Sequence, residues 1–105
     1  MNLRELARNH VLGNPTRLAV MLYLLPRDRV LFKELLSVLE LTPGNLDSHL
    51  RALEKAGYVK VYKVFADRPR TAVRITDEGA RRTMEYLKAL RKALSDVTGS
   101  GLPPL

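Results

Sequence analysis

The chain has 105 residues, the length of one domain with a single core. Its 46 % hydrophobic content predicts a folded protein, and its net charge of +7 predicts attraction to polyanions. The absence of cysteine excludes disulfides and thiolate metal sites, and the lack of tryptophan, with 6 % aromatic residues, argues against a stacking platform for single strands.

Two helices are predicted first. Residues 3–12 have an amphipathic helical pattern. Asn14 is a favourable N-cap, and Pro15 fits the first helical position because no N–H is needed there. The helix that follows is apolar on nearly every side up to Leu25, so we expect it to be the central core helix, ended by Pro26.

A helix-turn-helix is predicted next. Residues 30–32 either form a short strand or lead directly into a helix over residues 33–40. Thr42 and Pro43 then repeat the cap-and-proline pattern of the core helix. Two short helices joined by so few residues are typical of a helix-turn-helix.

The second helix of this pair, about residues 43–56, has two different faces. Leu46, Leu50 and Leu53 recur at spacings of four and three, so this stripe should face a core. The opposite face carries short polar and cationic side chains that can reach base edges or phosphates. These are Asn45, Asp47, Ser48, Arg51 and Lys55.

A basic hairpin follows. Residues 58–65 and 71–76 are rich in valine and aromatic residues and predict two strands, with Phe65 on the same face as Val59. Residues 66–70 are too many and too polar for a tight turn, so we expect a projecting loop. Five cations and one anion lie between residues 58 and 76. Beside the polar helix, this predicts a nucleic-acid docking surface; a solvated basic surface that serves solubility is the alternative.

A long helix is predicted at the end, over about residues 77–97, with Thr76 as its cap. Its seam recurs at alternating spacings of three and four and favours self-association. The seam consists of Ala80, Thr83, Leu87, Leu90, Leu94 and Val97. The alternative is a helix that lies on its own domain. Residues 98–105, with glycines and two prolines, are expected to form a flexible tail.

Catalytic patterns are not found in the sequence. The two histidines are far apart: His10 is expected to pack or to contact a second copy, and His49 either contacts DNA or has a half-buried structural role. No serine has a nucleophile-elbow context, and no glycine-rich phosphate loop occurs. We therefore expect no enzyme activity, no cofactor and no metal. Without an apolar signal core or a membrane-spanning run, we expect a cytoplasmic protein.

Three segments together resemble a winged helix-turn-helix transcriptional regulator of the ArsR/MarR-like group of archaea and bacteria. They are GNPTRLAVMLYLL, LTPGNLDSHLRALEKAGYV and RITDEGARR, similar to the opening helix, the recognition helix, and the end of the wing with the dimer helix. The resemblance implies a mainly α fold with a small antiparallel β-hairpin (α+β). It implies one winged helix domain over residues 1–97, with N- and C-terminal dimerisation helices.

The resemblance also implies a homodimer on double-stranded DNA, with recognition helices in successive major grooves and wings, about residues 63–71, on the minor groove or backbone. The implied DNA contacts are Thr42, Gly44, Asn45, Asp47, Ser48, His49, Arg51, Lys63, Arg68 and Arg70. The expected dimer contacts are Leu3, Leu6, His10, Thr83, Leu87, Leu90, Leu94 and Val97.

Individual roles follow from base and phosphate chemistry. Asn45 suits adenine, and Arg51 suits phosphate or guanine. Asp47 either accepts from a cytosine amino group or orients Arg51. The missing cysteines set the chain apart from metal-sensing members of the group, and the sequence specifies no effector.

Two other functions fit the sequence less well. A non-specific architectural, chromatin-like binder would share the basic hairpin but bind random and cognate duplexes equally. A winged-helix protein-interaction module would have no duplex affinity, and the basic hairpin argues against it.

Overall fold

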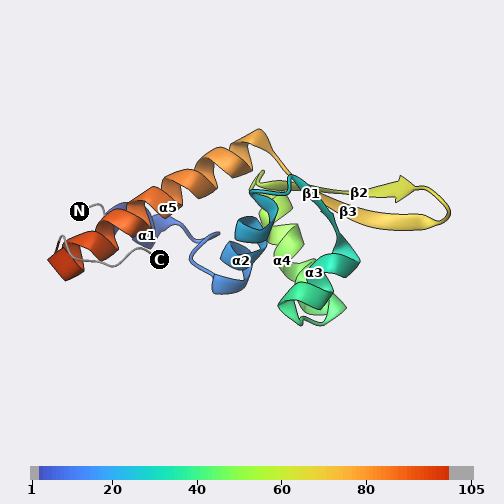
Figure 1. The fold of residues 1–105 in the computed structure, drawn as a ribbon, viewed down its shortest axis with the longest axis horizontal. Helices are drawn as coiled ribbons and strands as arrows, with labels where there is room; N and C mark the ends of the chain where they lie inside the picture. Colours follow the sequence, from blue (N-terminus) through green and yellow to red (C-terminus); the bar gives the residue numbers. More distant parts are fainter. Residues whose placement is uncertain (1–2, 100–105) are drawn as a thin grey trace.

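The computed structural model describes residues 3–99 as five helices and a three-stranded sheet (Figure 1). In chain order the elements are α1 (Leu3–Arg8), α2 (Pro15–Leu24), β1 (Arg29–Leu31), α3 (Phe32–Leu39), α4 (Pro43–Lys55), β2 (Val59–Phe65), β3 (Pro69–Ile75) and α5 (Asp77–Thr98). This order confirms the predicted mainly α fold with a small antiparallel sheet. Thr98, assigned above to the tail, is still helical, and residues 100–105 lie outside the described residues.

The central helix is α2, as its apolar sequence predicts. The Asn14 side chain accepts hydrogen bonds from the backbone N–H groups of Thr16 (2.9 Å) and Arg17 (3.1 Å), which a helix start leaves without partners. The inward face of α2 packs against the inward leucines of α3 and α4. The fully buried residues of this contact are Val20, Met21, Leu24, Leu35, Leu46 and Leu53.

The three strands form one antiparallel sheet in the order β1-β3-β2. The alternative left open for residues 30–32 is resolved, because residues 29–31 form β1 and pair with β3 through Val30 and Val73. Val59, Val73 and Ile75 are buried on the face that packs against the helices. Because side chains alternate along a strand, Arg29, Lys60 and Arg74 point to the other face of the sheet, where they are exposed.

The β2–β3 hairpin, residues 59–75, projects from the domain and is called the wing (Figure 1). Its last pair is Phe65 with Pro69, so the turn holds only residues 66–68. The prediction of a five-residue loop is wrong, because a proline can be the first residue of a strand. Arg70 therefore lies in β3. Phe65 is 77 % exposed near the end of the wing and is not part of an apolar face.

The start of α5 is joined to the turn that ends α4. Thr76 Oγ1 accepts a hydrogen bond from the Gly79 N–H (2.8 Å) and donates to the carbonyl of Gly57 (2.6 Å). The Thr76 N–H donates to the Tyr58 carbonyl (3.0 Å). Gly79 packs on the same turn so closely that a Cβ there would lie 2.1 Å from the Tyr58 carbonyl oxygen. These contacts set the direction in which α5 leaves the domain.

The first helix is shorter than predicted. It ends at Arg8 rather than near Leu12, because the Asn9 side chain accepts a hydrogen bond from the Leu12 N–H (2.7 Å) and holds this segment in a turn. Leu12 is buried in the core, and α1 packs against α5 (Figure 1).

The molecule is elongated, with extents of 53 × 26 × 23 Å. Its radius of gyration is 15.3 Å, against about 13 Å for a compact domain of this size. The reason is visible in Figure 1, where α5 and the wing project in opposite directions from the core. Both projections expose surface that the core of one chain does not use.

Candidate nucleic-acid interface

The outward face of α4 is not covered by the chain. The leucine stripe of this helix lies in the core, and most side chains on the opposite face are exposed. Thr42 caps the helix by accepting a hydrogen bond from the Asn45 N–H (3.3 Å). A Cβ at Gly44 would meet no atom within 4 Å, so packing within the chain does not require glycine there. The exposed predicted residues are Thr42, Gly44, Asn45, Asp47, Ser48 and Arg51.

Asp47 and Arg51 form an ion pair on this face. Arg51 Nε donates to Asp47 Oδ2 at 2.8 Å, one helical turn away. This contact is the one that the second of the two roles considered for Asp47, orienting Arg51, requires. The side chains are 79 % (Arg51) and 52 % (Asp47) exposed, so water screens the pair and it contributes little stability. Arg51 can therefore exchange this partner for a phosphate at small cost.

His49 is turned toward the body of the protein. It is half-buried, and its Nδ1 lies 3.5 Å from Arg17 Nη1. Arg17 also donates from Nε to the Val11 carbonyl (2.9 Å) and from Nη2 to the His10 carbonyl (3.0 Å). Burial, followed by the nearby Arg17 charge, lowers the pKa of His49. Of the two predicted roles of His49, this position matches the structural one.

Arg17 is the residue that sequence reasoning missed at this site. It lies in the first turns of the apolar helix α2, where a half-buried guanidinium must find acceptors. An arginine three positions after an N-cap in an otherwise apolar helix is the signal that could have indicated this role.

The wing carries the predicted basic residues in three different settings. Lys63 Nζ donates to the Thr71 hydroxyl across the hairpin (2.8 Å). Arg70 lies 3.7 Å from Asp67 and is 39 % exposed, whereas Arg68 is exposed in the turn. The end of the wing therefore presents a cation next to the apolar side chain of Phe65.

A shallow cleft of about 330 Å³ connects the wing to the start of α3. Its lining includes Arg68 and Arg70 from the wing, and Phe32 and Lys33 from α3. Lys33, which the sequence did not single out, thus lies beside the two wing arginines. The helix-turn-helix and the wing contribute to one basic surface.

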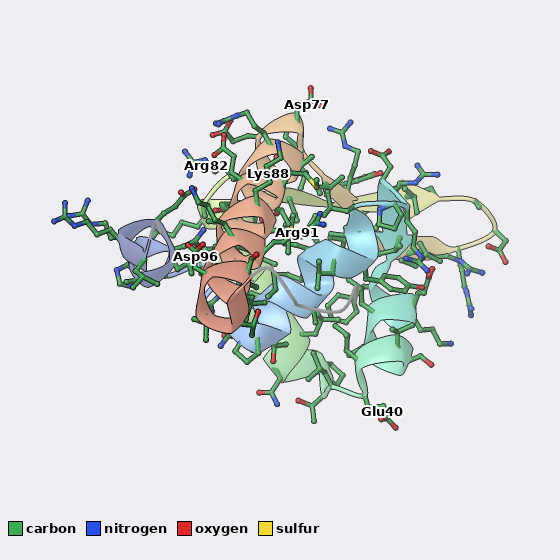
Figure 2. All side chains as sticks on the ribbon, turned by 60° about the vertical axis from the view of Figure 1, so that its left-hand side comes forward. Glu40, Asp77, Arg82, Lys88, Arg91 and Asp96 are labelled. Carbon is green, nitrogen blue, oxygen red and sulfur yellow. The ribbon has the colours of Figure 1, made fainter. Side chains whose placement is uncertain are left out.

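The residues predicted for self-association lie in different settings. The exposed ones are Leu3, His10, Leu94 and Val97, and the half-buried ones are Leu6, Leu87 and Leu90. Thr83 is instead fully buried within its own chain, where its hydroxyl has no partner among residues 3–99. Ala89 and Ala93 are also buried on α5, because α1 packs there. One side of α5 thus lies on its own domain, and an adjacent apolar edge stays accessible; charged side chains including Lys88 and Arg91 also line this helix (Figure 2).

Residues 3–99 contain no group of three or more histidine, cysteine, aspartate or glutamate side chains arranged to hold a metal ion. None of their helices is both long and apolar enough to cross a bilayer.

A family assignment follows from this architecture and from the sequence. Residues 16–94 match the family described as the winged helix DNA-binding domain. The chain belongs to this family. The winged helix domain is a DNA-binding module of transcriptional regulators and not an enzyme. Its helix-turn-helix is α3–α4 here, and its wing is β2–β3.

Solved structures with the same winged helix architecture come from archaea and bacteria. A transcriptional regulator homologue from Pyrococcus horikoshii OT3 is 50 % identical, with a TM-score of 0.89 over 91 % of this chain and 96 % of that one. YusO from Bacillus subtilis is 25 % identical, with a TM-score of 0.76 over 94 % and 70 % of the two chains. HlyU from Vibrio cholerae is 26 % identical, with a TM-score of 0.59 over 76 % and 83 %. The predicted resemblance to ArsR/MarR-like transcriptional regulators is confirmed.

An uncharacterized protein of Methanocaldococcus jannaschii is 39 % identical over 57 residues. The match covers 53 % of this chain and 62 % of that protein, so the winged helix chain spans less than two thirds of its relative's length.

Proposed function

We propose that two copies of this chain form a transcriptional regulator that binds double-stranded DNA, with α4 in the major groove and the wing on the flanking minor groove or backbone. The observation that carries this proposal is the uncovered polar face of α4, which lies on the same domain as a basic wing. Because the partner is DNA, we place the regulator in the cytoplasm.

The start of α4 is the part that reads sequence in this proposal. Asn45 has an amide that can donate and accept at an adenine edge, and Ser48 lies one turn further along the same face. Arg51 is held by Asp47 until a phosphate or guanine replaces that carboxylate. At the helix start, Pro43 has no N–H and the Asn45 N–H is capped by Thr42, so the Gly44 N–H is the amide that can donate to a phosphate.

The wing supplies affinity rather than sequence reading. Arg68 and Arg70 suit the negative potential of a narrow minor groove, and Lys63 suits a backbone phosphate. Lys33 adds a fourth cation to this surface from the start of α3.

Dimerisation would use the accessible edge of α5 together with α1. Leu94 and Val97 are exposed, as is Met84, and Leu87 and Leu90 are partly exposed beside them. Apolar side chains spaced along one helix in this way favour a second helix as partner. Thr83 is not included in this surface, because its own chain buries it.

Selection of bound genomic fragments, followed by fluorescence anisotropy at fixed salt, tests the proposal. A sequence-specific regulator should bind a selected duplex at least a thousandfold more tightly than a random duplex. Asn45→Ala should remove most of that difference, whereas Lys92→Ala, an exposed change on α5, should preserve it. Equal affinity for selected and random duplexes would instead identify an architectural binder.

A further inference from the structure

Three cations lie next to one another across the outer face of the sheet. Arg74 of β3 is in register with Arg29 of β1 on one side and with Lys60 of β2 on the other. These three residues, called the cation row, are exposed on the face that points away from the core. Like charges directly opposite one another on neighbouring strands destabilise a sheet. The stability of the fold therefore does not explain why these three cations lie side by side.

Two exposed arginines of α5 have carboxylate partners. Arg81 and Arg82 lie 2.6–2.8 Å from glutamate oxygens on their own helix, α5. Within residues 3–99, no ion pair neutralises Lys60 or Arg74. Asp28 interacts electrostatically with Arg29, so the cation row is compensated in part and keeps a net positive charge at the middle of a small sheet.

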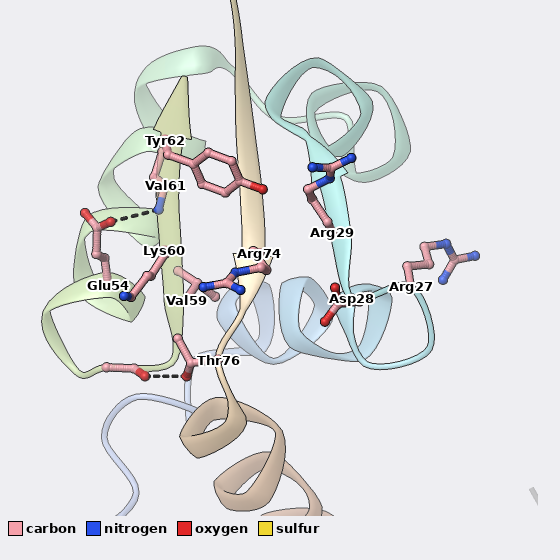
Figure 3. A pocket seen from close by; sticks show the side chains of 11 residues that line it. Arg27, Asp28, Arg29, Glu54, Val59, Lys60, Val61, Tyr62, Arg74 and Thr76 are labelled. Carbon is pink, nitrogen blue, oxygen red and sulfur yellow. Dashed lines mark hydrogen bonds between the residues drawn. The ribbon is translucent and has the colours of Figure 1, made fainter. Parts of the chain in front are cut away.

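The cation row lines a hollow with a volume of about 940 Å³ (Figure 3). The Arg74 guanidinium extends from β3 toward β2, where Lys60 lies (Figure 3). Two carboxylates, Asp28 and Glu54, also line the hollow. Glu54 already has a partner, since its Oε2 accepts a hydrogen bond from the Val61 N–H at the edge of the sheet (2.8 Å). The hollow falls in the size range of small-molecule sites, roughly 300–1,000 Å³.

Tyr62 adds a flat wall beside the cation row. Its partner on β3 is Ala72, whose small side chain leaves room for the ring to lie across the strand toward β1 (Figure 3). The nearby Tyr62 hydroxyl, as a hydrogen-bond acceptor, raises the pKa of Arg29, so the two side chains lie near each other over the sheet. A ring beside cations suits an organic group that is attached to an anionic one.

The hollow is separate from the DNA surface proposed above. The opposite face of the same strands, with Val59 and Val73, packs against the helices that include α4. Of α4, only Glu54 near its C-terminal end lines the hollow, whereas the polar residues at the start of α4, such as Asn45 and Ser48, do not.

We propose that the cation row binds a small molecule that carries two or more linked phosphate groups. Adjacent strands are about 4.8 Å apart, so the backbone positions of Arg29 and Lys60 are about 10 Å apart. A chain of phosphates can contact all three cations, whereas a single phosphate contacts two neighbours. The guanidinium groups of Arg29 and Arg74 can each donate two hydrogen bonds to phosphate oxygens, and Lys60 adds a compact charge.

Calorimetric titration with inorganic triphosphate at fixed ionic strength tests this site. Wild-type protein should show saturable binding. Arg74→Glu should weaken the affinity at least tenfold, and Lys92→Glu, an equal change of charge on α5, should alter it less than twofold. Absence of saturable binding to wild type overturns the proposal. An equal loss in both variants also overturns it, because general charge attraction then explains the binding.

A second titration with adenosine triphosphate distinguishes a nucleotide from an inorganic phosphate chain as the source of the linked phosphates. Binding at least tenfold tighter than that of triphosphate, and lost in Tyr62→Ala, supports a nucleotide as the ligand. Equal affinities that do not depend on Tyr62 support recognition of the phosphate chain alone.

The same variants test whether the cation row is separate from the DNA-binding surface. Arg74→Glu should melt at or above the wild-type temperature, since it replaces two like-charge contacts by opposite-charge contacts. Its duplex affinity should equal that of Lys92→Glu within threefold. A tenfold greater loss of duplex affinity, with triphosphate binding unchanged, assigns the cation row to DNA and overturns the proposal. Triphosphate binding by a protein without duplex affinity supports this site and rejects only the proposed function.

Discussion

Arg17 Nη1 lies 3.5 Å from His49 Nδ1, and this contact joins the recognition helix α4 to the start of α2. The same guanidinium is held by the carbonyls of His10 and Val11. Partial burial lowers the pKa of the His49 imidazole, and the nearby fixed charge of Arg17 acts in the same direction. His49 is therefore neutral in the folded protein over a wider pH range than in the unfolded chain.

A pH dependence of stability follows from this relationship. The pKa of His49 is lowered on folding, so the unfolded chain takes up more protons as the pH falls through the ordinary value of 6.5. The free energy of unfolding should therefore decrease as the pH is lowered from about 7.5 to about 5.5. Urea unfolding of wild type and His49→Gln across this window measures the effect. If both proteins show the same slope, His49 is not the responsible group.

The wing arginine Arg68 should contribute a phosphate contact. Arg68→Ala should weaken binding to all duplexes and make the slope of log K against log salt shallower by about 0.9. Lys88→Ala, which removes an equal charge from α5, should leave the slope unchanged. A slope that stays the same in Arg68→Ala removes this residue from the interface.

The accessible edge of α5 should hold the dimer together. Leu87→Asp combined with Leu94→Asp places two carboxylates in a seam that excludes water, so sedimentation should detect monomers with weakened duplex binding. Circular dichroism must show wild-type helix content, because Leu87 is partly buried. Lys92→Asp on the polar side of α5 is the matched control. A folded double variant that still sediments as a dimer contradicts this interface.

Gly79→Ala should destabilise the protein although alanine favours helices. The new Cβ would lie 2.1 Å from the Tyr58 carbonyl oxygen, so backbone must shift at a cost of about 1–3 kcal/mol. Gly44→Ala is the control, because a Cβ there meets no atom within 4 Å and stability should be unchanged or slightly raised. Equal thermal stability of the two variants would show that α5 can move away from the turn.

The sequence predicted those parts of the fold that depend on local chemistry. Asn14, Thr42 and Thr76 each cap a helix as expected, because the residues that a cap serves lie within three positions of it. The leucine stripe of α4 also predicted which face of that helix would be buried and which exposed. Much of the candidate DNA surface follows from these two patterns.

Contacts between distant segments could not be predicted in the same way. The link between Arg17 and His49 spans 32 positions, and no periodic pattern signals it. The cation row requires the strand register that pairs Arg74 with Arg29, and β1 was only one of two alternatives for its segment. The three-residue turn of the wing was missed because Pro69 was assigned to the loop rather than to the first position of a strand.

The hydrogen bonds of Thr76 and the close packing of Gly79 act as a rigid corner between the recognition helix and the long terminal helix. In a symmetric dimer that pairs through that terminal helix, the corner would fix the orientation of each recognition helix relative to the dimer axis. The distance between the two recognition helices is then set by a few residues near Gly57 and Tyr58. In the proposed arrangement these residues contact neither the DNA nor the other subunit. A change in this small corner would alter which spacing of half-sites the pair can measure, while the chemistry of base reading stays the same.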